Sequence, residues 1–68
     1  MMQITEIGNR KIIRFSEKEY EEFKKYGDEK GKIVEYRNKK WLVLAVEIDT
    51  ARMEGVIDLL LQNQNLVD

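Results

Sequence analysis

The feature that most constrains this chain is an internal repeat. Residues 4–15 (ITEIGNRKIIRF) and residues 33–44 (IVEYRNKKWLVL) align at a constant offset of 29 positions. In each copy a short polar turn separates two segments rich in apolar residues. Because self-similarity indicates the architecture before any single residue is interpreted, we expect one domain, residues 1–68, built from two units, residues 1–31 and residues 32–68.

Each copy of the repeat predicts a β-hairpin with a two-residue turn. Gly8-Asn9 in the first copy supplies residues that tolerate the positive φ of such turns. Arg37-Asn38 is the equivalent turn in the second copy, where a longer loop with a bulge is the alternative. Counting outward from the turns gives these opposed pairs: Ile7 with Arg10, Glu6 with Lys11, Thr5 with Ile12, Ile4 with Ile13, Tyr36 with Lys39, Glu35 with Lys40, Val34 with Trp41 and Ile33 with Leu42. The opposed Glu and Lys in each hairpin would help to fix the register.

A helix is expected after each hairpin. The segment Ser16-Glu17-Lys18-Glu19 has the pattern of a capping box, and Gly27 is the expected end of the first helix. This helix would bury a stripe formed by Tyr20, Phe23 and Tyr26. The second helix is expected to begin near Asp49-Thr50. Its buried face would consist of Met53, Val56, Ile57, Leu60 and Leu61.

The predicted fold is therefore an α+β duplication of order ββα-ββα, with a four-stranded antiparallel sheet and two helices packed on one face. The strand over residues 40–48 has apolar residues on both of its faces. We expect one set to lie in the core beneath the helices: Leu42, Leu44, Val46 and Ile48. The other set would lie on the helix-free face: Trp41, Val43 and Ala45, joined by Val34, Tyr36, Ile7, Ile12 and the stem of Arg14. An apolar patch of that size indicates an association surface.

Size and composition favour self-association. A domain of 68 residues buries only about 60% of the surface that its unfolded chain exposes. The chain has no Cys and no His, which excludes disulfides and removes the usual zinc ligands, so we predict no metal and no cofactor. A homodimer would supply the missing burial. The chain shows no signal peptide and no apolar run near the roughly 20 residues of a membrane-spanning helix, so a soluble cytoplasmic protein is expected.

The expected function is a non-catalytic protein–protein interaction or inhibitor-type module that occupies a surface of a macromolecular partner. The predicted partner or dimer interface consists of Val34, Tyr36, Arg37, Trp41, Val43, Ile12 and Arg14. The alternative is a nucleic-acid-binding regulator, in which bases stack on aromatic side chains while cations follow the backbone. Its contacts would be Arg10, Arg14, Arg37, Lys39, Tyr36 and Trp41. The 12 basic and 13 acidic residues, with a net charge of -1, argue against this alternative.

An enzyme is the least supported class. The sequence has no Cys nucleophile, no His base and no glycine-rich phosphate-binding motif. Ser16 is the only serine and is explained as a helix cap, while Glu6 and Glu35 each face a Lys. Asp49 and Glu54 are interpreted as residues of a helix start and not as ligands of a hard cation. We therefore predict no catalytic residues.

Overall fold

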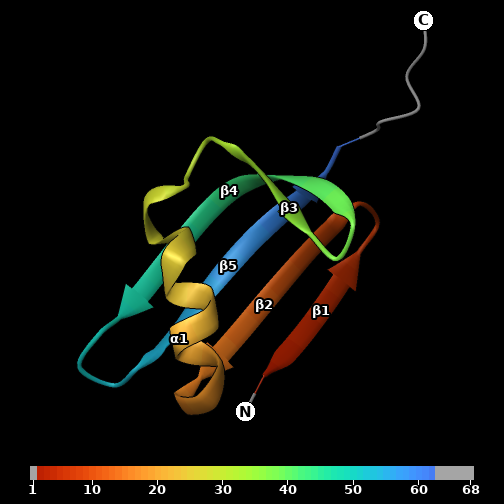
Figure 1. Cartoon of the computed structure of the whole chain (residues 1–68). Coiled ribbons are helices and arrows are strands. Elements are labelled where there is room, and N and C mark those ends of the chain that lie inside the picture. The colour runs from red at the N-terminus through yellow and green to blue at the C-terminus, as the bar shows by residue number, and fades with distance from the viewer. Residues whose placement is uncertain (1, 63–68) are drawn as a thin grey trace, which may run out of the picture.

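The computed structural model describes residues 2–62, which form a five-stranded antiparallel sheet with one helical segment against one face (Figure 1). The strands are β1 (Gln3–Ile7), β2 (Arg10–Ser16), β3 (Ile33–Tyr36), β4 (Lys39–Asp49) and β5 (Glu54–Leu61). The helical segment consists of the 3-10 turn η1 (Glu17–Glu19), the helix α1 (Tyr20–Phe23) and the 3-10 turn η2 (Lys24–Asp28). The strand order is β1-β2-β5-β4-β3, so the last strand in the sequence lies at the centre of the sheet.

Both predicted hairpins are confirmed, with the predicted register. β1 pairs with β2 from Ile7 opposite Arg10 outward, and β3 pairs with β4 from Tyr36 opposite Lys39 outward. Three of the four turn residues adopt the expected positive φ, which is 59° at Gly8, 54° at Arg37 and 68° at Asn38, whereas Asn9 does not. Positive φ at both Arg37 and Asn38 is the requirement of a type I′ turn, which matches the twist of the flanking strands. The turns alone therefore fix how four of the five strands pair.

The first predicted helix is confirmed as the helical segment over residues 17–28, which ends one residue beyond Gly27. Its three aromatic side chains, Tyr20, Phe23 and Tyr26, are buried against the sheet. The ring of Phe23 stacks on Phe15 of β2 with 5.2 Å between centroids. Aromatic pairs at this separation add to the stabilisation that burial alone provides.

The second predicted helix is wrong, because residues 54–61 form β5. Residues 50–53 reverse the chain: the Arg52 N–H donates to Asp49 Oδ1 at 3.1 Å, and Met53 has a φ of 56°. β5 pairs with β2 on one side and with β4 on the other. A helix here would leave the facing backbone groups of β2 and β4 without strand partners. The predicted fold class is therefore corrected to five strands and one helical segment, and only the hairpins repeat.

The position of β5 reverses the faces of the second hairpin. β2 and β4 are both antiparallel to β5 and are therefore parallel to each other, whereas β1 and β3 lie on opposite outer sides. Superposing one hairpin on the other then requires a rotation of 180° about the strand axis, which exchanges the two faces of the sheet. Ile13 is accordingly fully buried on the helix side, whereas its repeat equivalent Leu42 lies on the helix-free face. The prediction that Ile12 and its repeat equivalent Trp41 both lie on the helix-free face is therefore wrong for Trp41.

A β-bulge in β4 changes which of its residues belong to the core. Val43 is opposite Leu59 and Ala45 is opposite Asp58, so Leu44 is an extra residue in the register. The extra residue shifts the alternation of β4, so Val43 before the bulge and Val46 after it both face the helix side. Val46 and Ile48 therefore pack against the core as predicted, although Leu42 and Leu44 do not belong to it. The buried set is Ile13, Phe15, Tyr20, Phe23, Tyr26, Tyr36, Trp41, Val43, Ile57 and Leu59.

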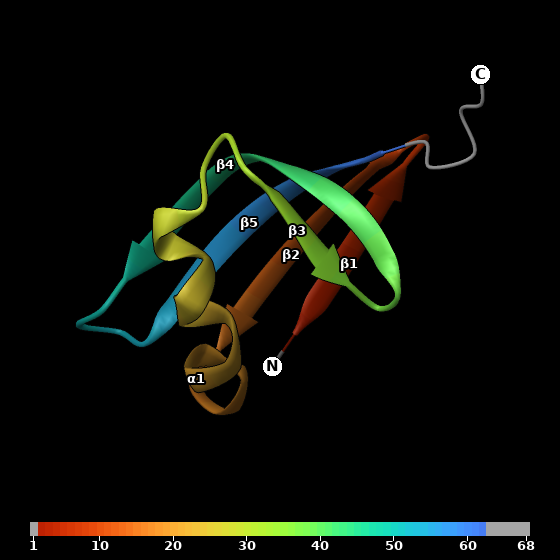
Figure 2. The same cartoon turned by 45° about the horizontal axis from the view of Figure 1, so that its top comes forward.

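The β3–β4 hairpin curls over the helix side of the sheet (Figure 2). This curl brings Tyr36 to 6.0 Å from the ring of Phe23, centroid to centroid. It also brings Lys11 of β2 over two rings of the second hairpin: the Nζ atom lies 4.9 Å from the centroid of Trp41 and 5.4 Å from that of Tyr36. The same Nζ atom is 3.1 Å from a carboxylate oxygen of Glu6. Strands that are not neighbours in the sheet are thus joined by a partly buried cation.

Gly55 is required by close packing at the core side of β5. A Cβ at this position would lie 2.6 Å from the carbonyl oxygen of Glu47 and 2.6 Å from Cζ of Phe15. We expect Gly55→Ala to destabilise the protein by about 1–3 kcal/mol, because a backbone atom and a packed ring must both move. Urea unfolding followed by circular dichroism measures this loss.

The matched control is Gly27→Ala in the helical segment. There a new Cβ would approach only the end of the Ile48 side chain, at 3.2 Å. Alanine also favours helical backbone relative to glycine by up to about 1 kcal/mol. We expect this variant to lose much less stability than Gly55→Ala, and equal losses would contradict the packing assigned to Gly55.

Stability should depend on the ionisation of Tyr26 at alkaline pH. Burial, followed by the nearby Tyr36 and Glu22, raises the pKa of the Tyr26 phenol. A pKa that is higher in the folded state than in the unfolded state, where it is about 10, contributes stability that is complete below that pH and is lost as pH rises through the folded pKa. We expect the free energy of unfolding to fall less steeply above about pH 10 in Tyr26→Phe than in the wild type. Urea unfolding at a series of pH values measures the slopes, with Tyr20→Phe as control, and an unchanged slope in Tyr26→Phe would contradict this assignment.

Candidate functional site

The helix-free side of the sheet, called the outer face below, carries one row of aligned side chains from all five strands. The strand registers place the row in the order Ile7, Arg10, Leu60, Leu42 and Ile33. Directly opposed residues of antiparallel strands project to the same face. With neighbouring strands about 4.8 Å apart, this outer row extends over about 19 Å.

The outer row is largely apolar and accessible. Ile7 is 63% exposed at one end, and Ile33 is 56% exposed at the other. Leu60 and Leu42 between them are half-buried, as are the adjacent Ile12 and Leu44. The described helical segment lies on the opposite side of the sheet and does not cover them (Figure 1). Contiguous apolar groups of this kind are typical of interaction surfaces.

Arg10 is the one charged member of the outer row, and it is engaged within the chain. Its Nε atom donates to Asp58 Oδ1 at 3.0 Å, and its Nη2 atom donates to Asp58 Oδ2. These hydrogen bonds, together with the charge of Asp58, raise the pKa of Arg10. The two-point geometry holds the guanidinium along the sheet and leaves its alkyl stem beside the apolar members of the row.

The residues of the predicted interface do not form one patch. Trp41, only 6% exposed, Tyr36 and Val43 are buried on the helix side, and Val34 is half-buried on the same side. The indole Nε1 of Trp41 donates to the carbonyl oxygen of Tyr36 at 3.1 Å, which satisfies its polar atom inside the fold. Arg37 lies in the β3–β4 turn, with its guanidinium 5.4 Å from the ring centroid of Tyr36. Ile12 and Arg14 lie on the outer face, as predicted from the first hairpin alone.

The residues of the alternative nucleic-acid site are also divided. The two hairpin turns meet at one end of the sheet around a cavity of about 320 Å³, lined by Gly8, Asn9, Arg10, Lys11, Arg37 and Lys39 among others. This brings Arg10, Arg37 and Lys39 together, whereas Arg14 lines a different groove near the opposite end of β2. Tyr36 and Trp41 line the cavity too, but they are buried beneath Lys11, whereas base stacking requires accessible ring faces.

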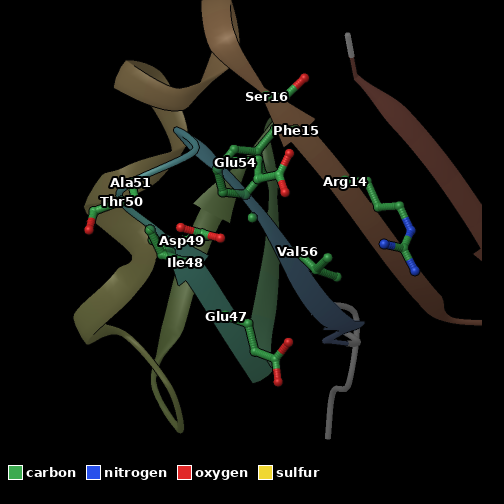
Figure 3. Close-up of a pocket in the computed structure, with 11 residues that line it drawn as sticks. Arg14, Phe15, Ser16, Glu47, Ile48, Asp49, Thr50, Ala51, Glu54 and Val56 are labelled. Atoms are coloured by element: carbon green, nitrogen blue, oxygen red, sulfur yellow. The ribbon is translucent and has the colours of Figure 1, made fainter.

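A larger, open groove of about 770 Å³ lies beside the β4–β5 loop (Figure 3). Three carboxylates line it, from Glu47, Asp49 and Glu54, together with Arg14. Figure 3 shows Glu47 and Glu54 at opposite ends of the groove, while Asp49 holds the loop through Arg52. Across residues 2–62, no group of three or more His, Cys, Asp or Glu side chains is arranged to hold a metal ion. The groove therefore offers dispersed charge and not a converging set of ligands.

Comparisons with protein families, curated proteins and solved structures found no match. The part of the chain that the structure describes contains no helix with the length and apolar character needed to cross a membrane.

Leu60 is the central residue of the outer row, and the sequence pattern assigned it to a helix. A signal for the strand is present in β5, where Gly55, Ile57, Leu59 and Leu61 alternate with Glu54, Val56, Asp58 and Leu60. The first set faces the helical segment and the second set faces outward. Because the second set contains two apolar residues, Val56 and Leu60, as well as two charged ones, the sequence does not show a simple alternation of apolar and polar residues.

The buried position of Trp41 gives a direct test of the nucleic-acid alternative. Trp41 is the only tryptophan, so its fluorescence reports on this position alone. We expect a single-stranded oligonucleotide to leave its emission unchanged, because no base reaches the ring. Saturable quenching that weakens with added salt would contradict the assignment, and acrylamide quenching of the folded and unfolded chain calibrates the response.

Proposed function

We propose that this chain is a non-catalytic protein-interaction module, of the inhibitor or regulator type, that acts by covering a surface of a macromolecular partner with its outer face. The outer row is the observation that carries this proposal, since it aligns four apolar side chains across five strands. Residues held on paired strands need little reorganisation before binding, which reduces the entropy that binding must offset.

The shape of the outer face favours a macromolecule over a small ligand. Small-molecule sites are concave and bury most of the ligand, whereas this face is a sheet surface with its most exposed apolar residues at its two edges. An apolar centre surrounded by polar side chains is the usual anatomy of a protein–protein interface. The surrounding residues here are Gln3, Thr5, Arg14, Glu35, Lys40 and Glu47.

Catalysis and nucleic-acid binding have less support than protein binding. Glu6, one of the two carboxylates aligned by the repeat, lies 3.1 Å from Lys11, as expected for a structural ion pair. Ser16 occupies the position before the helical segment, with the extended backbone of an N-cap residue. Arg10 is engaged by Asp58, which reduces its value as a phosphate ligand. We therefore propose binding without catalysis and a protein as the partner.

The proposal is tested by immobilising the wild-type chain and the variants Ile7→Glu and Ile33→Glu, and by quantifying proteins captured from the native cells. Each variant places a charge in the outer row, where a partner would have to desolvate it. We expect capture of the partner to fall at least about tenfold, which corresponds to about 1.4 kcal/mol. Circular dichroism would verify that the variants remain folded.

Met53→Glu is the matched control. Met53 is an exposed apolar residue in the β4–β5 loop, outside the outer row. A partner of the outer face should be retained by this variant and lost by the other two. If every captured protein binds all four chains equally, the outer face is not the binding surface.

A further inference from the structure

β1 is an edge strand that no other element of residues 2–62 covers. It is the first strand in the sheet order, and all five of its residues, Gln3–Ile7, are exposed. Natural edge strands usually carry Lys, Pro, a bulge or a covering element that prevents pairing with another chain. β1 has no Lys, no Pro and no bulge, and its one charged residue, Glu6, is paired with Lys11.

The other edge of the sheet is protected. β3 has only four residues, of which Tyr36 is buried and Val34 is half-buried. The strand curls toward the helix side (Figure 2). The segment before it is tied to β4 by a hydrogen bond from the Gly31 N–H to the Val43 carbonyl oxygen, at 2.8 Å. Within the part of the chain that the structure describes, β1 is thus the edge that presents a full strand to solvent.

The register of the β1–β2 hairpin identifies the backbone groups that β1 leaves unpaired. The residues that flank a two-residue turn, Ile7 and Arg10, form a hydrogen-bonded pair. Because such pairs alternate along an antiparallel ladder, Thr5 and Gln3 also direct their backbone groups toward β2. Ile4 and Glu6 therefore direct theirs away from the sheet. The free edge presents two N–H donors and two carbonyl acceptors.

We propose that a second copy of this chain pairs with β1 in antiparallel orientation, about a two-fold axis that passes through Thr5 perpendicular to the sheet. In this register the outward groups of Ile4 in one copy meet those of Glu6 in the other, which forms four backbone hydrogen bonds. Thr5 stands opposite Thr5 of the second copy, and Gln3 stands opposite Ile7. No pair brings two charges together, and a cross-strand Thr–Thr pair is favourable.

The pairing joins two sheets of five strands into one sheet of ten. Because the axis is perpendicular to the sheet, both outer faces lie on the same side, and the exposed Ile7 of each copy gains a neighbour. The two outer rows then form one composite surface. A small chain with limited burial of its own also gains stability from the assembly. This inference depends on the edge of β1 and not on the partner proposed for the outer face.

A single-cysteine variant tests the register. The chain has no native Cys, so Thr5→Cys introduces one thiol, on the two-fold axis. Opposed residues of a non-hydrogen-bonded pair lie about 4.5 Å apart at Cα, within the range of a disulfide. We expect mild oxidation of dilute Thr5→Cys to give a covalent dimer on a non-reducing gel, whereas Glu35→Cys on the opposite edge should stay largely monomeric. Equal cross-linking of both variants would overturn the proposal.

Charged substitutions at Thr5 test the same pairing without a covalent cross-link. Thr5→Lys and Thr5→Asp each place like charges directly opposite one another, which destabilises a cross-strand pair. We expect sedimentation velocity to show dimers for the wild type, monomers for each variant alone, and dimers again when the two variants are mixed in equal amounts. A wild type that stays monomeric from about 1 µM to about 1 mM, or variants that dimerise as well as the wild type, would overturn the proposal.

Discussion

The fold depends on the double pairing of β5. Among residues 2–62 this strand is the last in the sequence, yet it lies at the centre of the sheet and joins two hairpins whose strands do not pair with each other. Its Ile57 lies between Ile13 of β2 and Val46 of β4, so one residue ties both hairpins into the core. Its Leu60 does the same on the outer face. Without β5, neither the buried layer nor the outer row would exist as a continuous structure.

The same pairing explains why two similar hairpins have different roles. Because β5 separates them, one hairpin is rotated by half a turn relative to the other, and equivalent residues lie on opposite faces. Ile12 is thus an outer-face residue, while its counterpart Trp41 is buried and donates its indole N–H to the carbonyl of Tyr36. The larger aromatic residues of the second copy fill the core beside Lys11. The divergence between the copies indicates a requirement for packing, not for a binding site.

Features determined by residues close together in the sequence were predicted correctly. Features determined by contacts between residues far apart in the sequence were not. The two-residue turns determined both hairpin registers, and the spacing of Tyr20, Phe23 and Tyr26 determined the face of the helical segment. β5 was missed because Val56, Ile57, Leu60 and Leu61 also have helical spacing, and because its hydrogen-bond partners are far away in the sequence. The β-bulge at Leu44 could not be predicted either, because it appears only in the pairing of β4 with β5. For the candidate site, Ile12 and Arg14 were placed correctly on the outer face, whereas Leu60 was not.

Residues 54–61 form the middle strand of the sheet. Nuclear Overhauser effects measured on the isotope-labelled protein would test this placement. The structure predicts cross-strand contacts from Ile57 to Ile13 on one side and from Ile57 to Val46 on the other, and from Leu60 to Arg10 and to Leu42. Strong sequential amide–amide contacts through residues 54–61, with no contact to β2 or β4, would indicate a helix and would contradict both the fold and the outer row.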